Sequence, residues 1–421
     1  MTVAVLELND QHLIIQTEDG TLHTEPGFAQ LTASGIETGD RARAVAWQQP
    51  QHNYNQYWRQ FNQLALPSKQ RWARHHADIA FAQIKQLVQA AGSPEQLILS
   101  VPGSFSDQQL SLLLGLASAV PVQIIAVIDS ALASSANQAA SQSLVIELQL
   151  QQAVVSKVIS ADGRQHINDQ EVIPDLGVMQ LYNAAARHIS DQLIADYRYD
   201  PLHTSDGEQL IYDQLPHWLM QLGWDGEISV TVPSPQGDLN LVLRKSQIAD
   251  IFEQRLNGLN SIIKKHPQAE LCFSHSASLL PTLLPQFAQA PLYNQNSGID
   301  NCFELQDKLT AGELRRICEL DTPSTSKTGA NKKAHQATHL LYRDHGYPLD
   351  HPVSLHIDDN QLSLVTGIDN RAALVFVVDN HQLKVLHQQQ DLQVELPKTC
   401  QVGKTLTVAG HKLRLIEVSN A

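Results

Sequence analysis

The sequence predicts an α/β protein that ends in a small all-β domain, and three observations support this fold class. Residues 97–136 alternate strand and helix patterns. An apolar strand pattern at residues 143–150 repeats the pattern at residues 3–8. Residues 351–421 contain about six short strand patterns separated by turn residues, which is typical of a small sandwich or barrel.

The stretch from residue 97 to residue 136 predicts strand, turn, helix, strand and helix. LILSV at 97–101 has the length of a buried strand, and the following Pro-Gly pair favours a turn. A Ser-Asp pair then begins a helix whose leucines recur at helical spacing. VQIIAVI at 122–128 predicts a second buried strand, and Asp129 or Ser130 caps a further helix of small residues.

Length and composition limit the possible classes of protein. A chain of 421 residues is long enough for two or three domains or lobes. The formal net charge of −14 disfavours binding to a phosphate backbone, so no nucleic-acid partner is expected. The four cysteines are scattered without a CxxC pair, which predicts reduced thiols and no zinc site. Apolar runs are too short to cross a bilayer and no secretory signal is visible, so we expect a cytoplasmic protein without membrane insertion.

The motifs VPGSFSDQQ and VIDSALASSA resemble a segment of the nucleotide-binding domain of DnaK-type heat-shock chaperones. In that family, part of the actin, hexokinase and heat-shock superfamily, the segment runs roughly VPAYF, N or S, DxQR, and later NEPTAAA. The resemblance implies a two-lobed actin-like ATPase fold made of duplicated ribonuclease-H-like units. It would place lobe I at residues 1–142, lobe II at 143–320, a linker and closing helix at 321–350, and a β-sandwich-like domain at 351–421.

The first phosphate loop of that family lies in the N-terminal hairpin and reads IGIDLGTTNS. Here VAVLEL, NDQ and HLIIQT predict the same hairpin. The family aspartate falls on Glu7, the glycine on Asn9, and the two threonines on Asp10 and Gln11. A side chain in place of glycine obstructs the close approach of a phosphate, and an added carboxylate repels it.

The other nucleotide positions depart from the family in the same way. The family's second loop, LVVDLGGGTTDVSVI, aligns with LVIELQLQQAVVSKVI, which puts Glu147 on the aspartate and Gln149 on the first glycine. The adenosine-contacting loop aligns with AELCFSH, where Ser274 and His275 replace glycines. Asp129 falls near the family's catalytic-site glutamate and is expected to remain only as a helix cap.

Two further assignments depend on weaker patterns. Arg59 is the basic residue nearest to the family's catalytic-site lysine, although an ordinary exposed arginine is the better explanation. The apolar positions between Lys69 and Gln89 predict one long helix before the central stretch. The similarity of residues 3–8 and 143–150 fits a duplicated fold, but two unrelated buried strands also account for it.

Because the departures concentrate on the positions that would touch nucleotide, the sequence predicts a non-catalytic DnaK-like pseudo-ATPase that acts as an interaction scaffold. Protein partners are expected, with no cofactor and no metal. The alternative is a divergent chaperone ATPase that binds ATP and magnesium weakly and handles client polypeptides. A sugar or acetate kinase of the same superfamily fits less well, because it also needs phosphate loops.

Overall fold

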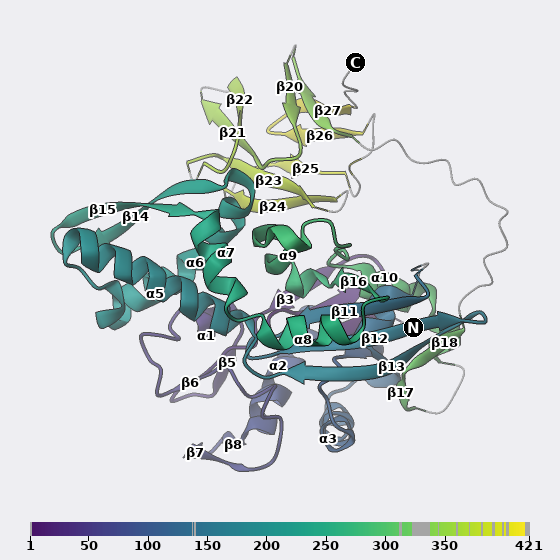
Figure 1. Cartoon of the computed structure of the whole chain (residues 1–421). Helices are drawn as coiled ribbons and strands as arrows, with labels where there is room; N and C mark the ends of the chain where they lie inside the picture. The colour runs from purple at the N-terminus through teal and green to yellow at the C-terminus, as the bar shows by residue number, and fades with distance from the viewer. Residues whose placement is uncertain are drawn as a thin grey trace. The chain divides into compact units, whose positions relative to one another are not determined.

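The computed structural model describes residues 2–136, 138, 140–310, 314–321, 337–343, 345–358, 361–369, 371–379, 382–389, 392–397, 400 and 404–416. The chain divides into two compact units, Met1–Ser324 and Thr325–Ala421 (Figure 1). The first unit is mixed α/β and the second is strand-rich. No helix in the described part of the chain is both long enough and apolar enough to span a membrane.

The first sheet of the first unit has the strand order β17-β10-β9-β1-β2-β3. Its strands are β1 (Val3–Glu7), β2 (Leu13–Thr17), β3 (Leu22–Glu25), β9 (Gln96–Val101), β10 (Gln123–Asp129) and β17 (Arg316–Ile317). β1, β2 and β3 form an antiparallel meander, while β9 runs parallel to β1 and β10 runs parallel to β9. The predicted strands at 97–101 and 122–128 are therefore confirmed, and the structure shows that they are neighbours in the sheet.

The second sheet repeats this arrangement. Its order is β16-β11-β12-β13-β18, formed by β11 (Gln142–Leu148), β12 (Ala153–Ala161), β13 (Arg164–Ile173), β16 (Glu270–Phe273) and β18 (Glu319–Asp321). Again the first three strands form an antiparallel meander, and the next strand runs parallel to the first. The two sheets thus share the same order and direction of their first four strands.

Helices separate and cover the two sheets. α4 (Ser130–Ser135) and α10 (Ser297–Glu304) pack with the inner faces of both sheets in one core cluster. The outer face of the first sheet is covered mainly by α2 (His76–Ala90) and α3 (Asp107–Ala117). The outer face of the second sheet packs against α5 (Val178–Tyr197), α6 (Ser205–Asp225), α7 (Lys245–Glu253), α8 (Asn257–Lys265), α9 (Leu279–Leu283) and the hairpin of β14 (Glu227–Ser234) and β15 (Gly237–Arg244).

Smaller elements complete the first unit. They are β4 (Ala29–Leu31), β5 (Ile36–Thr38), α1 (Asp40–Arg43), β6 (Asn53–Tyr54), β7 (Ala65–Gln70), β8 (Ala73–His75) and α11 (Gln306–Leu309). The helix predicted from Lys69 is wrong at its start, because β7 and β8 pair as a hairpin and α2 begins only at His76. Apolar spacing is sparse before His76, so hairpin pairing outweighs a helical extension there.

The second unit contains two antiparallel sheets around one core. One has the order β20-β19-β27-β26-β25, with β19 (His339–Tyr342), β20 (His345–Pro348), β25 (Val394–Glu395), β26 (Thr405–Val408) and β27 (His411–Ile416). The other has the order β22-β21-β23-β24, with β21 (Val353–Asp358), β22 (Gln361–Thr366), β23 (Leu374–Asp379) and β24 (Gln382–Gln388).

The closing helix expected within residues 321–350 is not present in the described part of that range. Instead β19 and β20 pair with each other in antiparallel fashion, and β19 also pairs with β27. Along β19, Leu340 and Tyr342 are buried while His339 and Leu341 are more exposed, which is the two-residue period of a strand. Residues 322–336 of the expected linker lie outside the described residues.

Candidate functional site

The two turns that the resemblance assigns to phosphate binding contact each other directly. The first turn, residues 8–12, joins β1 to β2, and the second turn, residues 149–152, joins β11 to β12. The Asn9 side chain donates a hydrogen bond of 3.0 Å to the carbonyl oxygen of Leu148. The backbone N–H of Leu150 donates one of 2.7 Å to the Asp10 carboxylate. Asn9 and Asp10 are each only 4% exposed, so these bonds join the two sheets inside the molecule.

The second turn is also bound to the beginning of α5. The N–H groups of Val178 and Met179 donate to the carbonyl oxygens of Gln149 and Leu150, at 3.0 and 2.9 Å. The first N–H groups of a helix are a common binding place for anions. In this protein, backbone carbonyls already occupy these two donors.

Gly177 allows the turn to approach the helix so closely. A Cβ atom at this position would lie 2.4 Å from the carbonyl carbon of Gln151 and 2.5 Å from the nitrogen of Gln152. Both distances are much shorter than a van der Waals contact, so the atoms would clash. Any other residue at position 177 would therefore push the second turn away from α5.

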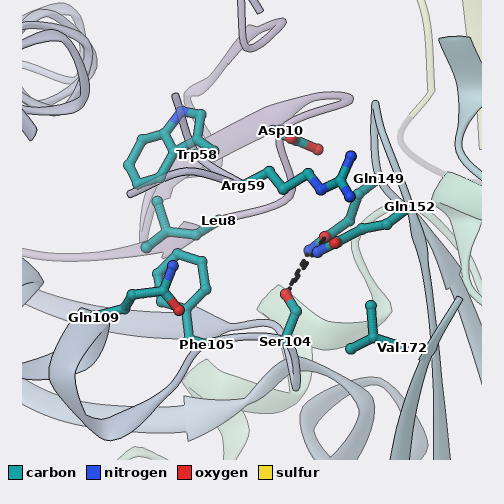
Figure 2. Close-up of a pocket in the computed structure, with 10 residues that line it drawn as sticks. All are labelled: Leu8, Asp10, Trp58, Arg59, Ser104, Phe105, Gln109, Gln149, Gln152 and Val172. Carbon is teal, nitrogen blue, oxygen red and sulfur yellow. Dashed lines mark hydrogen bonds between the residues drawn. The ribbon is translucent and has the colours of Figure 1, made fainter. Parts of the chain in front are cut away.

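A small polar cavity lies beside the two turns (Figure 2). It has a volume of about 100 Å³, and Leu8, Asp10, Trp58, Arg59, Ser104, Phe105, Gln109, Gln149, Gln152 and Val172 line it. Pockets that bind drug-sized ligands usually hold about 300–1,000 Å³. The cavity is therefore far too small for a nucleotide.

Several polar side chains that line this cavity already form hydrogen bonds with one another. Gln149 donates to the Ser104 hydroxyl at 3.2 Å and accepts from Gln152 at 2.6 Å. Figure 2 shows the guanidinium of Arg59 extending between Asp10 and these two glutamines. Arg59, the predicted counterpart of a catalytic lysine, thus lines the cavity, as do Asp10 and Gln149.

Burial changes the acidity of Asp10. Desolvation raises the pKa of its carboxyl to about 6, although the hydrogen bond from Leu150 and the charge of Arg59 both act in the opposite direction. At pH 7 a carboxyl with a pKa of about 6 is still mostly ionised, so Asp10 acts mainly as a carboxylate that accepts the hydrogen bond from Leu150.

Two further predicted residues, Glu7 and Glu147, project toward the layer between the sheets. Val5 and Val145, two residues before each glutamate in its strand, belong to the core cluster of that layer. Burial raises the pKa of Glu7 to about 7. Burial, followed by the charge of Asp129, raises the pKa of Glu147 to about 8. Glu147 is 3% exposed, and its Oε2 atom has no hydrogen-bond partner among the described residues.

Asp129 caps α4, as the sequence predicts, and also forms a buried ion pair. Its carboxylate accepts from the N–H of Ala131 at 3.0 Å and from Gln170 at 2.9 Å. Arg316 in β17 forms a salt bridge to the same carboxylate. Its guanidinium also donates to the carbonyl oxygens of Pro102 and Phe105, each at 3.1 Å.

Arg316 and Gln170 are functional candidates that sequence reasoning missed. Arg316 lies far along the chain from Asp129, in a short polar segment without periodicity. Gln170 lies on β13, where a bulge between residues 167 and 169 changes the side to which later residues point. Neither feature leaves a pattern in the sequence that predicts the contact.

The remaining predicted residues are placed near the turns but outside the cavity. Gln11 donates its backbone N–H to the Asn9 side chain at 3.0 Å. Ser274 follows β16 and donates its backbone N–H to the carbonyl oxygen of Ile146 at 2.9 Å. Its hydroxyl is 2.7 Å from that of Ser276, and His275 begins a short 3₁₀ helix. Neither Ser274 nor His275 lines the cavity.

A second set of hydrogen bonds joins α6 to the last residue of α1 and to the residues that follow it. Gln209 accepts from the N–H of Trp47 at 3.0 Å and donates to the carbonyl oxygen of Arg43 at 3.0 Å. Gln48 donates to Asp206 at 2.8 Å. The indole of Trp47 stacks on the ring of Tyr212, with 4.2 Å between centroids. The two halves of the first unit are therefore connected at this second place as well as at the turns.

Comparison of the sequence with known protein families gave no match, and comparison with curated proteins gave no similar protein.

Proposed function

We propose that this chain is a DnaK-like pseudo-ATPase that acts in the cytoplasm as a protein-interaction scaffold. In this proposal the first unit is an actin-like pair of lobes, each built on a ribonuclease-H-like sheet. The repeated order and direction of β1, β2, β3 and β9 in β11, β12, β13 and β16 supports a duplicated unit.

One observation carries the functional part of the proposal, namely the direct bonding of the two turns. In an actin-like ATPase the corresponding turns would hold the nucleotide phosphates between them. Here Asn9 bonds to Leu148, and Asp10 bonds to Leu150. A nucleotide could enter only if these buried hydrogen bonds broke, and each buried group left without a partner costs about 1–3 kcal/mol.

Titration of the full chain with ATP and magnesium tests this proposal. We expect no heat of binding in calorimetry and no phosphate release above buffer, while a DnaK-type chaperone run in parallel gives both. Micromolar binding together with measurable turnover would overturn the pseudo-ATPase and favour the divergent chaperone ATPase instead.

A capture experiment tests the scaffolding role separately. The tagged full chain would be incubated with native extract, washed, and then treated with ATP and magnesium. A scaffold that does not use nucleotide should retain the same partners, whereas an ATP-driven chaperone should release its clients. Release that depends on ATP would contradict the proposed function.

A further inference from the structure

A cluster of possible metal ligands lies on the second sheet, away from the two turns. Oxygen atoms of Asp169 and Glu171 and a ring nitrogen of His266 all lie within 4.8 Å of one another. This is the one such group among the residues that the structure describes. Asp169 is exposed, while Glu171 and His266 are partly buried.

The bulge in β13 determines which way the two acids point. Lys157 of β12 pairs with Asp169, but the next residue, Val158, pairs with Ile167, so Asn168 is an extra residue in β13. Because of this extra residue, the side chains of Gln165 and Gln170 point to the same face of β13, toward α4. Gln165 donates a hydrogen bond to the carbonyl oxygen of Ser135, and Gln170 donates one to the Asp129 carboxylate. Asp169 and Glu171 flank Gln170 and therefore share the opposite face of the strand.

The end of α8 supplies the histidine on that opposite face. Near the start of α8, a Cβ atom on Gly258 would lie 2.9 Å from Ile173, which is two residues beyond Glu171 in β13. At the other end, Lys265 bonds to both oxygens of Glu171, at 3.0 and 2.9 Å. The helix thus runs along β13, and its C-cap residue His266 meets the two acids.

The electrostatics of this place favour a cation. The carbonyl end of a helix carries a partial negative charge, and two carboxylates lie beside it. Lys265 at present balances one of them, and Lys157 lies opposite Asp169 in the sheet. Exposed ion pairs contribute at most about 1 kcal/mol to stability, so a more strongly bound cation can displace the lysine side chains.

We propose that Asp169, Glu171 and His266 form a zinc site that ties α8 to β13. One imidazole and two carboxylates suit Zn²⁺ better than Ca²⁺ or Mg²⁺, which prefer oxygen ligands alone. With metal–ligand bonds of about 2.0–2.1 Å, the three ligand atoms need to move to about 3.3 Å apart, which requires small rotations of side chains none of which is fully buried. A water molecule would complete the tetrahedron.

Zinc titration of the chelator-treated full chain tests this site. Because the chain has 19 histidines, the comparison must be between variants. We expect His266→Ala and Glu171→Gln each to lower the zinc affinity of one site at least about tenfold. Loss of a residue that only supports a metal ligand already lowers metal affinity about 10–100-fold. His52→Ala, which changes an exposed histidine outside the cluster, should titrate like the wild type. Lys265→Ala should bind zinc more tightly, because it removes the competing cation.

Cobalt substitution gives a second readout that does not depend on counting sites. A tetrahedral Co²⁺ absorption band should appear in the wild type and in His52→Ala, and should be absent from His266→Ala. Identical zinc titrations for the wild type and His266→Ala would overturn the proposal. A zinc dissociation constant above about 1 mM for the wild type would overturn it too.

Discussion

Asp129 is a fully buried carboxylate, and in the described structure Arg316 is its salt-bridge partner. Removal of one member of a buried ion pair leaves an uncompensated charge, which typically costs about 3–5 kcal/mol. We therefore expect Arg316→Met to lower the free energy of unfolding by that amount in denaturant titrations.

Two controls separate this ion pair from other effects of the substitution. Arg315→Met changes the exposed neighbouring residue and should alter stability by no more than about 0.5 kcal/mol. In the double variant Asp129→Asn with Arg316→Met, part of the loss should be recovered, because no buried charge remains. An equal loss in the single and the double variant would contradict this account.

Glu147 should make the protein less stable at high pH. Its pKa in the folded protein is raised to about 8 from an ordinary value of 4.5, so the folded state holds the proton more tightly than the unfolded state. The stabilisation is complete below about pH 4.5 and is lost as the pH rises through about 8. Glu7 and Asp10 shift in the same direction, with pKa values of about 7 and 6.

We therefore expect that, between pH 5 and pH 9, raising the pH lowers the free energy of unfolding more in the wild type than in Glu147→Gln. Chemical denaturation at several pH values in this range measures both slopes. Glu253→Gln, which removes an exposed acid at the end of α7, should leave the wild-type slope unchanged. Equal slopes in Glu147→Gln and the wild type would show that Glu147 does not titrate as described.

At the scale of elements, the packing of the second turn on α5 depends on Gly177. Gly177→Ala would place a methyl group against the backbone of Gln151 and Gln152. Such overpacking costs about 1–3 kcal/mol. It should also speed hydrogen exchange at the N–H groups of Val178 and Met179, because the carbonyls that they bond to move away.

Gly115→Ala is the matched control for this substitution. Gly115 lies exposed in α3, and a Cβ atom there would meet nothing within 4 Å. Alanine is better than glycine in a helix by about 0.5–1 kcal/mol, so this variant should become slightly more stable. Destabilisation of similar size in both variants would rule out a specific role for the contact at Gly177.

The sequence predicts elements with a strong local period well and long-range contacts poorly. The strand at residues 97–101, the strand at 122–128 and the Asp129 cap depend on neighbours within a few residues, and all are confirmed. The segment that contains β19 and β20 was predicted as a helix because the strand β27, with which β19 pairs, lies far away in the chain. Gln170 and Arg316 depend on a bulge and on a distant strand, so no local pattern reveals them.

At the scale of the whole molecule, the two units have separate hydrophobic cores. In the part of the chain that the structure describes, the core of the second unit draws its buried residues from 340–415, and the cores of the first unit draw theirs from 3–320. Units that share no core can unfold independently. We therefore expect two transitions in calorimetry of the full chain.

Core substitutions should assign these two transitions. Leu355 in β21 and Leu6 in β1 are both fully buried, each in the core of its own unit. Leu355→Ala and Leu6→Ala should each cost about 2–5 kcal/mol, and each should lower the midpoint of one transition while leaving the other in place. A single transition that both substitutions shift equally would show that the two units fold as one cooperative body, in spite of their separate cores.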